Sequence, residues 1–110
     1  MSTRTTFIGR EYREFDSMRR WELLFEEMRL VILDTGVKRG RDVNLLGIAN
    51  EDLRVRWEFG GALRGEDRTA YDGVVNVYIH GGDVWVGNWS GVDCRIDYRT
   101  GEILEAVFRK

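Results

Sequence analysis

The stretch Val74–Arg109 restricts the fold of this 110-residue chain more than any other part of the sequence. Its first two apolar runs are separated by Gly81-Gly82, and a two-residue hairpin loop requires positive φ, which glycine adopts readily. Gly-Gly between two such runs therefore predicts a tight β-hairpin. Two later loops that contain glycine, at 89–91 and 99–101, predict that the chain continues as an antiparallel meander.

These loops also set which residues lie opposite one another. They place Tyr78 opposite Trp85, Trp85 opposite Arg95, and Arg95 opposite Glu105 on one face of the meander. A slip of one residue would mix the polar and apolar faces, so the register is well specified. The other face is apolar in every strand and is predicted to carry Val75, Val77, Ile79, Val84, Val86, Val92, Cys94, Ile96, Leu104, Ala106 and Phe108.

A long helix is predicted before the meander, from Ser17 to Thr35. Its apolar residues recur at helical spacing and form one stripe, made of Met18, Trp21, Leu24, Phe25, Met28, Val31 and Ile32. Leu23 and Leu30 lie off this stripe, one heptad apart. Two interpretations of this pair stay open: Phe7 or Ile8 of the N-terminal segment covers them, or they contact another protein.

The elements together predict a single α+β domain over residues 1–110. Residues 43–49 and 53–59 read as a further hairpin, because apolar and charged residues alternate in the second run. The expected fold is one long N-terminal helix packed on a twisted antiparallel β-meander of five or six strands. The helix is expected to cover the apolar face of the meander.

Few residues in the chain suit catalysis or metal binding. His80 is the only histidine, and together with Asp83 and Asp97 it falls short of the usual ligand set of zinc. Cys94 is the only cysteine and belongs to the apolar face, where burial raises the pKa of a thiol. We therefore expect no metal, no cofactor and no enzymatic activity.

Composition limits the classes of partner that the chain is expected to bind. The formal net charge is −2, too small to indicate a nucleic-acid or membrane partner by itself. The first residues, 1–6, are polar and no apolar run approaches the length of a membrane span, so we expect a cytoplasmic protein without a membrane partner. Charge is distributed unevenly along the chain: residues 42–110 carry twelve Asp and Glu against eight Arg and Lys and are therefore acidic.

The polar face of the meander is the predicted binding surface. Tyr, Trp and Arg, which are enriched at the energetic centres of protein interfaces, lie side by side there. The predicted partner-binding residues are Tyr78, Trp85, Trp89, Asp93, Arg95 and Asp97. The acidic residues among them argue against nucleic acid, because they repel phosphate. The alternative interpretation, that these side chains only cover the outside of the sheet, stays open.

The end of the chain resembles a known class of proteins. The segments NVYIHGGDVWVGNW and CRIDYRTGEILEAVFRK resemble the last strands of small bacterial immunity proteins, the antidotes to secreted polymorphic or contact-dependent toxins. The resemblance covers about the last third of the chain. It implies a cytoplasmic protein-binding inhibitor that occludes a cognate toxin. The acidic half of the chain would suit a basic partner such as a nuclease toxin, and a homodimer is compatible with this interpretation.

A second function class fits the same sequence. Residues 60–73 read as a long loop with four glycines and several charges, and loops of this length are often functional. The alternative is therefore a small ligand-binding or enzymatic α+β domain with its site under the 60–73 loop.

Overall fold

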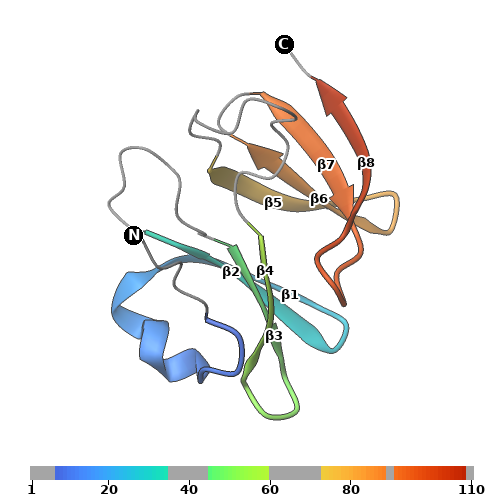
Figure 1. Ribbon diagram of the computed structural model, residues 1–110. Helices are drawn as coiled ribbons and strands as arrows, with labels where there is room; N and C mark the ends of the chain where they lie inside the picture. Colours follow the sequence, from blue (N-terminus) through green and yellow to red (C-terminus); the bar gives the residue numbers. More distant parts are fainter. Residues whose placement is uncertain (1–6, 35–44, 60–72, 89–90, 109–110) are drawn as a thin grey trace, which may run out of the picture.

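The computed structural model describes residues 7–34, 45–59, 73–88 and 91–108. They form two four-stranded antiparallel sheets preceded by a short 3-10 helix (Figure 1). The helix is η1 (Tyr12–Met18), and the first sheet holds β1 (Arg19–Phe25), β2 (Met28–Leu33), β3 (Leu45–Ala49) and β4 (Val55–Phe59). The second sheet holds β5 (Val74–His80), β6 (Asp83–Asn88), β7 (Val92–Ile96) and β8 (Ile103–Phe108). Both sheets keep the strands in sequence order.

The predicted long helix is wrong. Its segment instead forms the end of η1 and the β1–β2 hairpin, in which Phe25 pairs with Met28 across a two-residue turn. That turn is made by Glu26 and Glu27, and Glu26 has a φ of 53°. Glycine, asparagine and aspartate normally signal such a turn. Two glutamates carry no such signal, so nothing in the sequence interrupted the helical pattern.

Burial on both faces explains why the apolar pattern looked helical. In β2, Leu30 and Ile32 face the second sheet, while Val31 and Leu33 pack on the opposite side. A strand buried on both faces is a continuous apolar run without alternation, which periodicity alone cannot distinguish from a buried helix. Leu23 pairs with Leu30, and both pack in the core shared with the second sheet. The N-terminal segment therefore does not cover them.

The second sheet has the predicted register. Tyr78 pairs with Trp85, Trp85 with Arg95, and Arg95 with Glu105. Gly81 and Gly82 have φ values of 62° and 83°, as the Gly-Gly turn required.

Two β-bulges change details of the predicted apolar face. The first lies between Val74 and Asn76 and leaves Val74 buried and Val75 54% exposed, the reverse of the expectation for Val75. The second lies between Arg95 and Ile96 and makes Ile96 pair with Ile103, while Leu104, expected on the apolar face, is 50% exposed. A bulge adds one residue to one strand. The residues beyond the bulge therefore point to the opposite face from the one expected for a regular strand.

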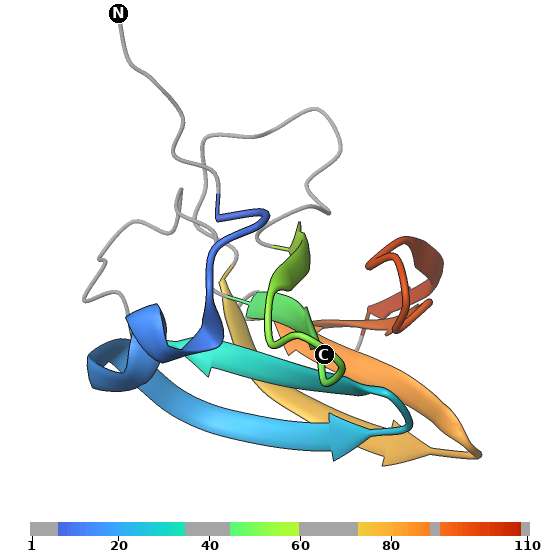
Figure 2. The same ribbon diagram turned by 90° about the horizontal axis from the view of Figure 1, so that it is seen from below.

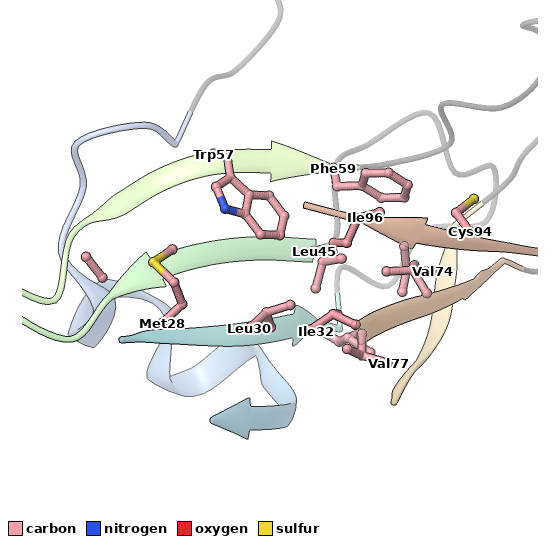
Figure 3. Close-up of a cluster of buried hydrophobic side chains, with 13 residues drawn as sticks. Met28, Leu30, Ile32, Leu45, Trp57, Phe59, Val74, Val77, Cys94 and Ile96 are labelled. Atoms are coloured by element: carbon pink, nitrogen blue, oxygen red, sulfur yellow. The ribbon is translucent and has the colours of Figure 1, made fainter. Parts of the chain in front are cut away.

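The main core lies between the two sheets (Figure 3). The inner face of the second sheet was correctly predicted at Val77, Val86, Cys94 and Ile96, all of which are buried. The first sheet covers it in place of the expected helix, with a set of large side chains that comprises Met28, Leu30, Ile32, Leu45, Trp57 and Phe59. The fold is therefore mostly β, and the α+β assignment is wrong.

The described elements leave one sheet face uncovered. η1 covers the far side of the first sheet, where Tyr12 and Phe15 are buried against Val31, Ile48 and other residues. Figure 2 shows η1 at one end of β1 and β2, with β5 and β6 alongside these strands. Among the described elements, none covers the far side of the second sheet. This side is the polar face predicted to bind a partner.

Candidate functional site

The outer face of the second sheet is the first candidate site. We use this name for the outward side chains of Tyr78, Trp85, Asp93, Arg95 and Glu105. The paired register of β5, β6, β7 and β8 brings Tyr78, Trp85, Arg95 and Glu105 into one row across the sheet. Tyr78, Trp85, Asp93 and Arg95 are half-buried, so each shows part of its surface to solvent while the sheet supports the rest.

Hydrogen bonds orient the polar groups of this face. The Tyr78 hydroxyl donates to Oδ2 of Asp93 at 2.5 Å, and Nε of Arg95 donates to Oε1 of Glu105 at 3.1 Å. Gly87 lies between Asn76 and Asp93 and leaves room beside this carboxylate. An exposed ion pair such as Arg95–Glu105 adds little stability. Its main effect is to hold the guanidinium in one orientation beside Trp85.

Trp85 is the largest side chain of the row. The ring of His80 meets it edge-on, with 6.5 Å between the ring centroids. A large aromatic ring held by its neighbours loses little conformational entropy when a partner covers it. Trp85 therefore suits the centre of a contact surface.

Of the other two predicted site residues, Trp89 lies outside the described residues, and Asp97 is not part of this face. Asp97 follows β7 and shapes the turn to β8, where Oδ1 accepts the backbone N–H of Arg99 at 2.9 Å and the Asp97 carbonyl accepts those of Thr100 and Gly101. The described residues contain no group of three potential metal ligands from His, Cys, Asp and Glu. The alternative site beneath 60–73 lies almost wholly outside the described residues.

Sequence reasoning missed the junction between the sheets. The Trp57 indole of β4 is buried and donates its N–H to the carbonyl of Tyr98 at 2.9 Å. It occupies a slot between two glycines, Gly47 and Gly101, where an added Cβ would lie 2.0 and 2.6 Å from ring atoms. The ring of Phe25 meets that of Tyr98 edge-on, at 4.8 Å between centroids. The junction anchors the β7–β8 turn, and with it one end of the outer face.

A cleft of about 550 Å³ lies beside this junction. It is lined by Glu27, Met28, Ala49, Glu51, Arg56, Arg99 and Thr100. Its charges are already paired: Nε of Arg99 lies 2.9 Å from Glu27, and Nη2 of Arg56 lies 3.2 Å from Glu51. Hydrogen bonds from its own backbone N–H and from Arg99 hold the pKa of Glu27 below its ordinary value. An acid stabilised in its charged form is a poor proton donor, so Glu27 is not suited to act as a general acid.

A smaller groove lies where the edges of the two sheets meet. It encloses about 290 Å³ between Trp21 of β1 and Val75 of β5, and Arg20 and Asn76 also line it. Trp21 was expected inside a helix interface and is instead 53% exposed. Trp21 and the half-buried Trp85 are the two described tryptophans that reach the surface, so Trp21 serves as an internal comparison for Trp85.

Comparison with known proteins assigns the chain to a family but does not indicate what the family does. A family model described as a domain of unknown function, DUF7957, matches residues 2–108. The chain belongs to this family. No curated protein and no solved structure matches the chain. Within the part of the DUF7957 chain that the structure describes, no helix is long and apolar enough to cross a membrane.

Proposed function

We propose that this DUF7957 protein is a protein-binding inhibitor, an immunity-type antidote that occludes a cognate toxin with the outer face of its second sheet. The observation that carries the proposal is the row of Tyr78, Trp85 and Arg95 on the one sheet face that no described element covers. An outer face that needed only solubility would not require two large aromatic side chains beside an arginine. These residue types are the ones that dominate binding energy in protein interfaces.

The hydrogen bonds of the outer face support this role. Tyr78 is held by Asp93, and Arg95 by Glu105, so both side chains are ordered before a partner arrives. Ordering a side chain on binding costs roughly 0.5–1.5 kcal/mol, and a preorganised surface avoids much of this cost. The face thus combines an aromatic centre with fixed charged groups around it, the arrangement that gives affinity and selectivity together.

Charge indicates the class of partner. Residues 73–108 carry five Asp and Glu against two Arg. Opposite charges accelerate association and disfavour wrong partners. A basic protein, such as a nuclease toxin, would complement this half of the molecule.

The test is a calorimetric titration of the purified chain with the protein encoded by the reading frame beside its own gene. Loss of a true anchor costs about 2 kcal/mol or more, which corresponds to a roughly 30-fold weaker complex. Trp85→Ala should therefore weaken binding at least about 30-fold. Trp21→Ala is the matched control, because it removes an exposed tryptophan from the first sheet and should leave the affinity unchanged.

Circular dichroism of both variants checks that they are folded. Absence of binding by the unaltered chain, or equal affinity of the Trp85→Ala variant and the parent, would contradict the proposal. A loss confined to Trp21→Ala would move the binding surface to the groove between β1 and β5.

A further inference from the structure

β8 is an edge strand with an unusual composition. Within the described part of the chain it pairs only with β7, so its other edge has no strand partner (Figure 1). Its residues are Ile103, Leu104, Glu105, Ala106, Val107 and Phe108, of which only Glu105 is polar. Leu104 is 50% and Phe108 is 65% exposed. An exposed apolar edge strand is a template for pairing with another strand.

The edge strands of the first sheet carry the charges that normally prevent such pairing. β1 includes Arg19, Arg20 and Glu22, and β4 includes Arg56 and Glu58. Charged side chains at an edge are a common protection against strand addition. In β8 the one charge, on Glu105, is neutralised by Arg95 of the neighbouring strand at 3.1 Å. Over the described residues 103–108, the edge of β8 is therefore apolar, and its one charge is paired.

We propose that β8 pairs antiparallel with β8 of a second copy of this chain, about a two-fold axis at Val107. A neutral strand suits its own copy, because two identical edges meet without repulsion between like charges. In this register the two Glu105 residues lie four positions apart, or roughly 13 Å along the strand. That separation exceeds the Debye length of about 8 Å at physiological ionic strength, so their repulsion is largely screened.

Side-chain sizes agree with the same register. The two-fold axis at Val107 sets Ala106 of one copy opposite Phe108 of the other, twice. Ala106 and Phe108 lie on the side of the sheet that faces the core, because their partners in β7 are Cys94 and Val92. A small residue opposite a large one lets the exposed Phe108 ring cover the neighbouring backbone, which reduces its exposed apolar surface.

The assembly would be one continuous eight-stranded sheet with the two outer faces on the same side. An interface of this kind is isologous, so the same residues contribute from both copies. Trp85 is two strands away from the β8 edge, in β6. The dimer therefore leaves the outer face accessible and does not depend on the proposed toxin binding.

Cysteine cross-linking tests the register. Opposite residues of paired antiparallel strands have Cα atoms about 4.5–5.5 Å apart, which lies within the range that a disulfide bridges. Val107→Cys should therefore give a disulfide-linked dimer under mild oxidation. Ile103→Cys is the matched control: it is 36% exposed on the same strand, and in this register its two copies lie about 26 Å apart. The native Cys94 is fully buried and lies on the other side of the sheet from Val107.

Sedimentation of the unaltered chain gives the second readout. Its weight-average mass should rise with concentration from that of one chain towards that of two. Phe108→Lys should shift this equilibrium towards the monomer. Leu24→Lys, at a residue 58% exposed on the β1 edge, should leave it unchanged. A chain that stays monomeric at every concentration would overturn the proposal, and so would equal cross-linking of the Val107→Cys and Ile103→Cys variants.

Discussion

Gly47 of β3 lies against the Trp57 indole, and replacing it with alanine should destabilise the protein strongly. An added Cβ would lie 2.0 Å from Cε2, 2.3 Å from Nε1 and 2.4 Å from Cζ2 of Trp57. The ring has little room to move, because it is 4% exposed and donates its N–H to the Tyr98 carbonyl. On its other side a Cβ at Gly101 would be 2.6 Å from the ring.

The expected magnitude follows from two costs. Forcing extra volume into a packed core typically costs about 1–3 kcal/mol. Breaking the hydrogen bond of the indole adds about 0.5–1.5 kcal/mol. The free energy of unfolding should thus fall by about 1.5–4.5 kcal/mol. With an unfolding entropy of about 2.1 cal/mol/K per residue over 110 residues, this lowers the melting temperature by roughly 6–20 °C.

Thermal and urea denaturation followed by circular dichroism measure this loss. Gly87→Ala is the matched control in the second sheet, where a Cβ would meet only the Asp93 carboxylate at 3.2 Å and Asn76 at 3.6 Å. It should cost less than about 1 kcal/mol. In a Trp57→Phe background Gly47→Ala should cost less than in the parent, because the two sites are coupled. A Gly47→Ala protein that melts within about 2 °C of the parent would refute the proposed packing of the junction.

Three further predictions concern the core, the thiol and the acid stability. Val86→Asp should prevent folding, because it buries a charge without a partner at a fully buried position; a cooperative melt near the parent temperature would contradict this. Cys94 should react with alkylating reagents slowly in the native protein and quickly in denaturant, so rapid native labelling would show that it is accessible. The pKa of Glu27 is lowered in the folded state, so its contribution to stability is present above its ordinary pKa of 4.5 and disappears as the pH falls through the lowered value. Melting curves of Glu27→Gln should therefore differ from the parent at neutral pH and converge with it in acid; a difference that persists in acid would contradict the assigned pairing with Arg99.

Turn chemistry made the second half of the chain predictable. The Gly81-Gly82 turn set the register of β5 and β6, and the loop before Val92 set that of β6 and β7. From this register the row of Tyr78, Trp85 and Arg95 followed directly. The bulges at Val75 and Leu104 were not predictable, because no residue there departs from the pattern of an ordinary strand.

The segment that forms β1 and β2 lacked such signals, whereas the predicted hairpin over residues 43–49 and 53–59 is confirmed by the antiparallel pairing of β3 and β4. The β1–β2 turn consists of two glutamates, and β2 is apolar on both faces. The sequence therefore matched a helical stripe although the segment folds as a hairpin. The packing of Trp57 between two glycines could not be predicted either. Gly47 and Gly101 lie 54 residues apart in the sequence, and only the packing of the two sheets brings both against the Trp57 ring. Long-range packing of this kind leaves no local pattern in a single sequence.

The most direct test of the proposed function is to map the partner contact on the folded protein. Backbone amide chemical shifts of the labelled chain would be followed by NMR while the protein encoded beside its gene is added. The largest changes should fall on Tyr78, Trp85, Asp93 and Arg95, with little change in β1 to β4. Changes that instead centre on Trp21 and Val75, or on the cleft of Glu27 and Arg99, would contradict binding through the outer face of the second sheet.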